Sequence, residues 1–132
     1  FIARVHKKLL RIYSKNVKVW IVDGELVRSA LFVDFTEGGH DKVYPFIPKG
    51  EVWIDDDISP KERKFVLLHE LHERNLMEKG WCYDIEEKRP LVNSSNKKAK
   101  IRKSAHDAAS KLEYYCRHHP KEIDKKLGEE VV

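Results

Sequence analysis

The segment Leu67–Glu73 carries the residues of this chain that are best suited to chemistry. His69, Glu70, His72 and Glu73 lie within five residues of an otherwise apolar stretch. His69 and Glu73 are four positions apart, and residues at that spacing lie on the same side of a helix. An imidazole and a carboxylate placed in this way can hold a divalent metal ion. We therefore predict a metal-binding helix, with Glu70 beside the ligands.

The surrounding sequence predicts the helix that these residues need. Ser59 can serve as the N-cap, Pro60 suits the first helical position, and Glu62 follows three residues after the cap. Gly80 is a typical stop signal. We expect a helix over residues 59–79.

On a helical wheel, with about 100° between residues, the chemical residues share a face with apolar ones. His69 and His72 fall within this face, Glu73 at its margin and Glu70 at its edge, and the apolar members are Phe65, Leu68 and Leu76. Because a buried imidazole or carboxylate is costly unless it is paired or binds metal, we expect His69, His72 and Glu73 to point inward as one site.

A second helix, expected over 104–118 and ended by Pro120, offers a partner surface. His106 and Glu113 lie beside its face of small and apolar residues, which consists of Ala105, Ala108, Ala109, Leu112 and Cys116. Small residues allow close approach, so His106 is expected to reach His69 and Glu73. These three form the predicted ligand set, which has the composition of a catalytic zinc site with an open position for water.

The remaining site residues receive supporting roles. Glu70 is the predicted general base. Glu113 is expected to orient His106 or to serve as a fourth ligand, and His72 to pack beside the ligands without binding. His40 follows Gly38-Gly39 and is interpreted as a turn residue, with a site residue carried by a loop as the alternative. A buried hydrogen-bond network without metal remains the alternative to the metal site.

The rest of the sequence predicts an α+β fold of one domain. Alternating apolar residues and turn signals over 17–55 indicate a small antiparallel sheet, with Asp23-Gly24 as a tight turn and strands over 25–28, 29–35 and 43–47. Two or three helices follow. Residues 86–103 are interpreted as an exposed loop or insertion, and 120–132 as a tail with a frayed helix.

Composition narrows the class of protein. The 132 residues are 41% hydrophobic and 36% charged, with a net charge of +4 and two cysteines. No apolar run has the length of a membrane span, and no signal-peptide pattern opens the chain, so we expect a cytoplasmic protein with free thiols. The basic segment 97–103 leaves nucleic-acid binding open as a minority hypothesis.

The order of sheet, strand and capped helix resembles the minimal zincin layout, whose zinc-binding signature is H-E-x-x-H. Here Glu73 stands in place of the second histidine. The chain is also similar to uncharacterised phage and prokaryotic proteins with an H-E-x-x-E helix followed by an A-H-x-x-A-x-x-x-E helix. The matching residues are Glu37-Gly38-Gly39-His40, Pro48 to Asp55, His69-Glu70, Glu73, Leu76-Met77, Tyr83-Asp84, Ala105-His106, Ala109 and Glu113.

The zincin-like layout implies a hydrolase of peptide or other amide bonds that uses zinc or another divalent transition metal, whereas the uncharacterised proteins imply a fold and a site but no substrate. It also implies that the strand before the helix binds an extended peptide or protein substrate, which assigns that role to Glu51, Val52, Trp53 and Ile54. A phage origin would place the protein in the host cytoplasm. A non-enzymatic accessory domain with a structural metal stays open as an alternative, because a site that uses both Glu73 and Glu113 as ligands would lower the Lewis acidity of the metal.

Overall fold

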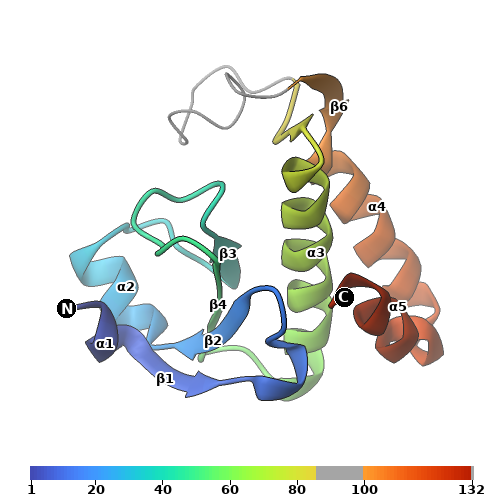
Figure 1. Ribbon diagram of the computed structural model, residues 1–132. Coiled ribbons are helices and arrows are strands. Elements are labelled where there is room, and N and C mark those ends of the chain that lie inside the picture. Colours follow the sequence, from blue (N-terminus) through green and yellow to red (C-terminus); the bar gives the residue numbers. More distant parts are fainter. Residues whose placement is uncertain (86–99, 132) are drawn as a thin grey trace.

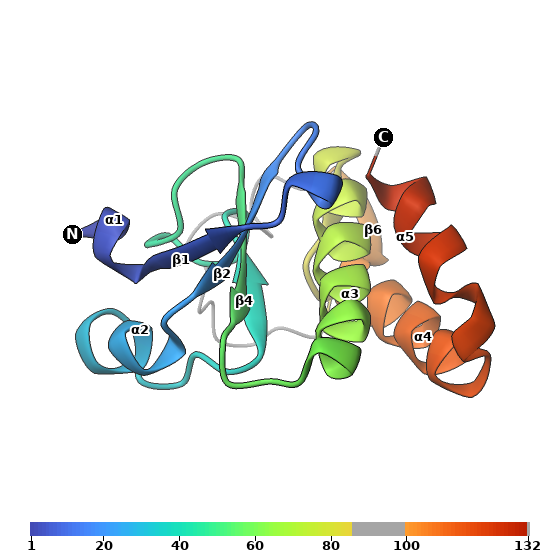
Figure 2. The ribbon, with the colours of Figure 1, turned by 90° about the horizontal axis from the view of Figure 1, so that it is seen from below.

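The computed structural model describes residues 1–85 and 100–131. Its layers are arranged around α3 (Pro60–Glu78), with a four-stranded sheet on one side and α4 (Ala105–His118) and α5 (Ile123–Glu130) on the other (Figure 1, Figure 2). The predicted α+β class is confirmed. A helix in this central position can bring groups from the sheet and from α4 to one site.

The sheet has the strand order β1-β2-β4-β3. The strands are β1 (His6–Leu9), β2 (Lys18–Val22), β3 (Gly38–His40) and β4 (Glu51–Asp55). Two neighbouring pairs, β1–β2 and β3–β4, are antiparallel as predicted, but β2 and β4 run parallel. The antiparallel prediction is wrong for that pair because the chain crosses over between them, as a parallel connection requires.

The crossover contains a helix where the sequence suggested strands. The Asp23 side chain accepts a hydrogen bond from the Leu26 N–H and caps α2 (Gly24–Ala30), so Asp23-Gly24 starts a helix and is not a hairpin turn. A Cβ on Gly24 would lie 2.0 Å from the Asp55 carboxylate, and only glycine fits this approach. Residues 31–37 and 43–47 also lie outside strands, which corrects the strands expected there.

Two apolar clusters cover the two faces of the sheet. One joins the sheet to the helices through Val19, Val52 and Ile54 against α3, α4 and α5. The other, on the opposite face, packs Trp53 and Val22 against Val27 of α2 and Phe35. Short helical segments complete the N-terminal region: α1 (Ile2–Val5) and the 3-10 turn η1 (Arg11–Tyr13). The inner strands β2 and β4 are therefore largely buried on both faces.

The two helices predicted to carry the site form where their signals indicated. Ser59 caps α3 by accepting from the Glu62 N–H, and α3 ends before Gly80, whose φ of +104° favours glycine. Ser104 caps α4 by accepting from the Asp107 N–H.

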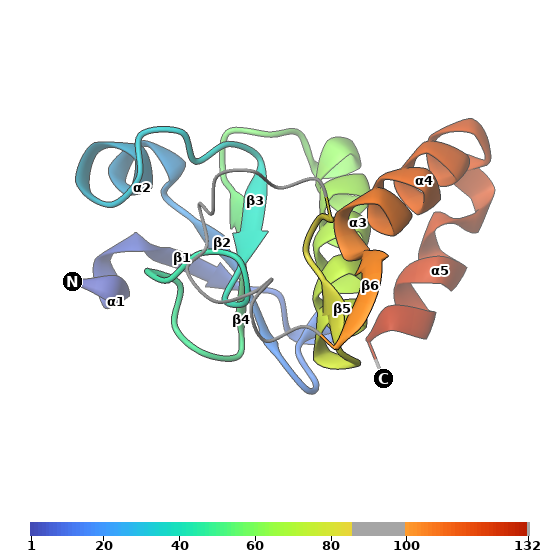
Figure 3. The same ribbon diagram turned by 90° about the horizontal axis from the view of Figure 1, so that it is seen from above.

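Between α3 and α4, β5 (Trp81–Cys82) pairs in parallel with β6 (Ile101–Ser104), next to the start of α4 (Figure 3). Of the loop predicted over 86–103, residues 86–99 lie outside the described residues. Residues 101–104 form a strand, which corrects that part of the prediction.

The C-terminal segment is more ordered than a frayed tail. The 3-10 turn η2 (Pro120–Glu122) leads into α5, which buries Ile123 and Leu127 in the cluster on α3. Cys82 and Cys116 are buried and free. None of the helices in the described ranges combines the length and apolar character needed to cross a membrane.

Candidate metal centre

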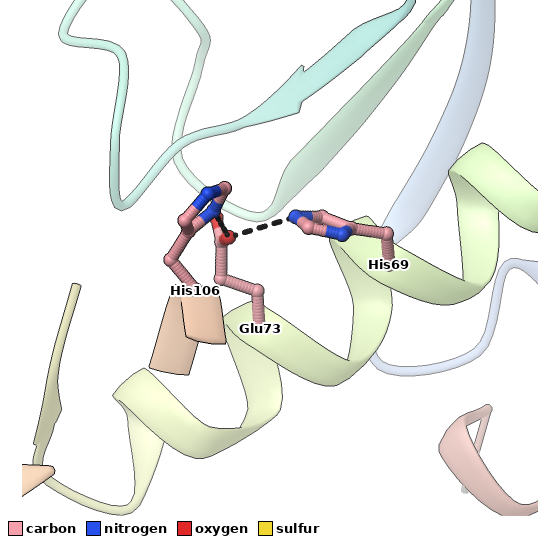
Figure 4. A group of neighbouring side chains, drawn as sticks. All are labelled: His69, Glu73 and His106. Atoms are coloured by element: carbon pink, nitrogen blue, oxygen red, sulfur yellow. Dashed lines mark hydrogen bonds and ion pairs between the residues drawn. The ribbon is translucent and has the colours of Figure 1, made fainter. Parts of the chain in front are cut away.

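The three predicted ligands converge on one carboxylate oxygen. Glu73 Oε2 lies 3.1 Å from His69 Nε2 and 3.0 Å from His106 Nδ1 (Figure 4). One donor atom from each residue lies within 4.8 Å of the others, close enough for a shared metal ion. The spacing on α3 and the partner on α4 therefore meet as the sequence predicted.

Local structure fixes the position of His106. The buried Ala105 and Ala109 bring α4 close to α3. The His106 N–H donates to the Tyr83 carbonyl at 2.8 Å, which ties the first turn of α4 to the segment after β5. The Ser104 hydroxyl donates to the same carbonyl at 3.2 Å. The His106 ring is held at the start of a capped helix, with 41% of its side chain exposed.

The second oxygen of Glu73 is held by a residue that the sequence did not assign to the site. His40 Nε2 lies 2.8 Å from Glu73 Oε1, and His40 and Glu73 are 0% and 2% exposed. Burial alone would raise the pKa of Glu73, but hydrogen bonds with His106, His40 and His69 hold this pKa far below its usual range. Glu73 is therefore a buried carboxylate that stays ionised.

Glu113 contacts His69 and not His106, which corrects its predicted partner. Glu113 Oε1 lies 3.0 Å from His69 Nδ1 as a close ion pair. Burial lowers the pKa of His69, but the carboxylates of Glu113 and Glu73 outweigh it and raise this pKa to about 10. Glu73 likewise raises the pKa of His106, and His69 lowers that of Glu113. In the absence of an ion, the neighbouring carboxylates therefore favour the protonated forms of the His69 and His106 imidazoles.

A cavity of about 220 Å³ opens beside this cluster. Its walls include the three predicted ligands, Glu70 and Glu113. Burial, together with the charge of Glu73, raises the pKa of Glu70 to about 7. A carboxylate with this pKa can take up and release a proton near neutrality. The cavity thus places a group that can exchange a proton beside donor atoms close enough together to hold a metal ion.

Two sets of predicted site residues lie elsewhere. His72 points to α5, where its Nδ1 lies 3.0 Å from Glu130 Oε2, so it does not support the ligands. The predicted substrate strand, Glu51–Ile54, is β4, which is paired on both sides by β2 and β3. An internal strand has no free edge, so it cannot bind an added peptide strand.

His40 is the member of this cluster that the sequence did not place in the predicted ligand set. It ends the edge strand β3, with His40 opposite Val52 of β4, and the strand places its ring against α3. The pair Gly38-Gly39 before it was a signal for a turn, but it also allows close packing, since a Cβ on Gly39 would lie 2.5 Å from the Tyr44 ring.

Comparisons with protein families, curated proteins and solved structures find no match to this chain, so its function must be argued from its own residues.

Proposed function

We propose that this chain is a metal-dependent hydrolase of peptide or other amide bonds, with zinc or another divalent transition metal held by His69, Glu73 and His106. One observation carries the proposal: two imidazoles and one carboxylate oxygen converge at the wall of a cavity. Three protein ligands with a fourth position open to a cavity are typical of catalytic zinc sites.

The donor geometry suits such an ion. Zinc bonds to nitrogen and oxygen of about 2.0–2.1 Å place tetrahedral ligands roughly 3.3 Å apart. The two nitrogens lie 3.1 and 3.0 Å from Glu73 Oε2, within a few tenths of an ångström of this separation, and all three donor atoms lie within 4.8 Å of one another. Glu113 beside His69 Nδ1 gives the imidazole the carboxylate partner that metal-binding histidines commonly have.

The residues around the cavity supply the rest of the chemistry. A bound zinc ion acts as a Lewis acid and lowers the pKa of water to about 7. Glu70 lines the same cavity and can accept a proton from an attacking water and return it to the leaving amine. The buried Glu73 stays ionised and can hold a cation throughout.

An extended substrate would lie along β3 and not along β4. β3 is one of the two edge strands of the sheet, and Thr36, Glu37 and Gly38 line the cavity at its start. A peptide paired with this edge would pass the open metal position, which is the strand-addition mode that the zincin-like layout implies. The substrate strand proposed here replaces the one expected from the sequence.

A non-catalytic domain is the competing function, and one observation favours it. Glu73 already receives hydrogen bonds from three imidazoles, so both of its carboxylate oxygens are satisfied without an ion. In that case the cluster would stabilise the contact between α3, α4 and β3. Metal content separates a metal-free network from a metal site, and peptide cleavage by the loaded protein separates a catalytic metal from a structural one.

The test is zinc titration of chelator-treated protein, followed by calorimetry and elemental analysis. We expect about one equivalent per chain in the wild type and loss of this equivalent in His69→Ala. His72→Ala, on the same helix but paired with Glu130, is the matched control and should keep it. A wild type without zinc, or a His69→Ala variant that retains it, would refute the metal site.

The compartment and a third function stay predictions. Two free buried cysteines fit a reducing cytoplasm, that of the host if the chain comes from a phage. In the basic segment 97–103, Lys100, Arg102 and Lys103 are exposed, and residues 97–99 lie outside the described residues. Nucleic-acid binding there would appear as an affinity that falls steeply with salt.

A further inference from the structure

His40 contacts Glu73 but is not among the residues that line the cavity. Its ring is fully buried, and its two nitrogens have different partners. Nε2 lies 2.8 Å from Glu73 Oε1, and Nδ1 lies 3.2 Å from the backbone nitrogen of Lys42. The ring thus bridges a backbone N–H and the carboxylate oxygen that faces away from His69 and His106.

These partners determine which ring nitrogen carries the proton. The Lys42 N–H can only donate, so His40 Nδ1 must accept and has no proton. A neutral imidazole then carries its proton on Nε2. Nε2–H therefore donates to Glu73 Oε1. Since Nε2 has no free lone pair in this arrangement, it cannot bind a metal ion.

From this geometry we infer that His40 is a positioning residue, which holds Glu73 Oε1 by a hydrogen bond so that Glu73 offers only Oε2 to the metal. The inference rests on the proposed metal site. Because His40 Nε2 carries a proton, we also expect no second ion between His40, Glu70 and Glu73, although donor atoms of these residues lie within 4.8 Å of one another.

The fold gives His40 the rigidity that this role requires. His40 ends β3, where it is paired with Val52 of β4, and its carbonyl accepts from the Val43 and Tyr44 N–H groups. Backbone pairing on one side and a turn on the other fix the ring against Glu73. Hydrogen-bonded partners behind metal ligands typically change metal affinity by about 10- to 100-fold when removed.

Cobalt(II) spectroscopy tests the inference, because the visible absorption of cobalt is strong at four-coordinate sites and weaker when the coordination number rises. In His40→Leu, Glu73 Oε1 is released and can turn to the ion. We expect weaker visible absorption and a Kd raised about 10- to 100-fold. His40→Gln keeps an N–H near the position of Nε2 and should restore most of the wild-type spectrum.

His72→Leu is the matched control, since it removes another histidine–glutamate contact of α3, one that faces α5 and does not line the cavity. It should leave the cobalt spectrum unchanged even if it lowers stability. A His40→Leu variant with wild-type spectrum and affinity would overturn the inference. So would two cobalt ions per wild-type chain, one of them lost in His40→Leu.

A second measurement needs neither metal nor a variant. In 15N NMR of the metal-free wild type, the His40 ring should appear as the neutral form protonated on Nε2. A proton on Nδ1 would overturn the inference whatever the metal content. A wild type that binds no cobalt but has the Nε2–H form would instead refute the proposed hydrolase and leave the His40–Glu73 hydrogen bond in place.

Discussion

At the scale of single residues, two glutamates three positions apart on α3 have opposite electrostatic environments. Burial and the neighbouring charge of Glu73 raise the pKa of Glu70 to about 7. Hydrogen bonds from three imidazoles outweigh burial and lower the pKa of Glu73. Pairs of carboxylates whose environments separate their pKa values often divide the roles of proton carrier and permanent anion.

The different environments of Glu70 and Glu73 predict that hydrolysis can be lost without loss of zinc binding. Glu70→Gln keeps the shape of the side chain but removes the carboxylate, so we expect zinc binding to persist and peptide hydrolysis to fall about 10²- to 10⁴-fold. Metal content and steady-state rates measure the two effects. Glu78→Gln, on the exposed end of the same helix, should change neither. If Glu70→Gln loses zinc, Glu70 is a ligand and not the base.

The sequence revealed the site residues that depend on helical spacing. His69 and Glu73 were found because four positions on one helix guarantee a common side, and His106 because small residues predict a close partner helix. His40 was missed because its burial depends on the pairing of β3 with β4, which no local pattern encodes. His72 was wrongly predicted to lie beside the ligands. A helical wheel shows that a residue faces inward but not which neighbouring element it contacts, and His72 contacts α5.

At the scale of elements, helix caps were the most reliable signals and strand signals the least. The Ser-Pro-x-Glu start at Ser59 predicted α3. Asp23-Gly24 was interpreted as a turn, yet Asp23 caps α2, since the same residue types serve both structures. The parallel pairing of β2 with β4 joins segments more than 30 residues apart in sequence and lies beyond local patterns.

The cap of α4 gives a prediction at this scale. Ser104 accepts from the Asp107 N–H at 2.9 Å, in the turn that carries His106. Ser104→Ala should lower the free energy of unfolding by about 1 kcal/mol and weaken zinc binding, because the turn that holds His106 loses a hydrogen bond.

Ser59→Ala is the matched control for that prediction. It removes the equivalent cap of α3, far along the helix from His69, and should cost similar stability with little change in zinc affinity. Urea unfolding and zinc titration measure both variants. Equal zinc affinities in the two variants would contradict a link between the α4 cap and the position of His106.

At the scale of the whole molecule, α3 connects the site to the C-terminal helix. One side of α3 presents His69 and Glu73 to the cavity, and the other side holds α5 through Glu130. Glu130 receives a hydrogen bond from the Asn75 amide at 3.1 Å in addition to its contact with His72. The docking of α5 therefore depends on a sheltered carboxylate and should respond to pH.

The direction of this response follows from the pKa of Glu130. Burial would raise this pKa, but contacts with His72 and Asn75, together with the charge of Lys79, lower it below 4.5. A carboxyl whose pKa is lower in the folded protein stabilises the fold above its unfolded pKa, and this contribution is lost as the pH falls through the folded pKa.

Glu130→Gln should therefore be less stable than the wild type by about 1 kcal/mol at pH 7. The difference should shrink towards zero below pH 4.5. Asp124→Asn, which removes an exposed pair with Lys64 between the same two helices, should show little difference at either pH. Urea unfolding across this pH range measures both variants, and a Glu130→Gln deficit that persists in acid would mean that the lost contact is steric and not ionic.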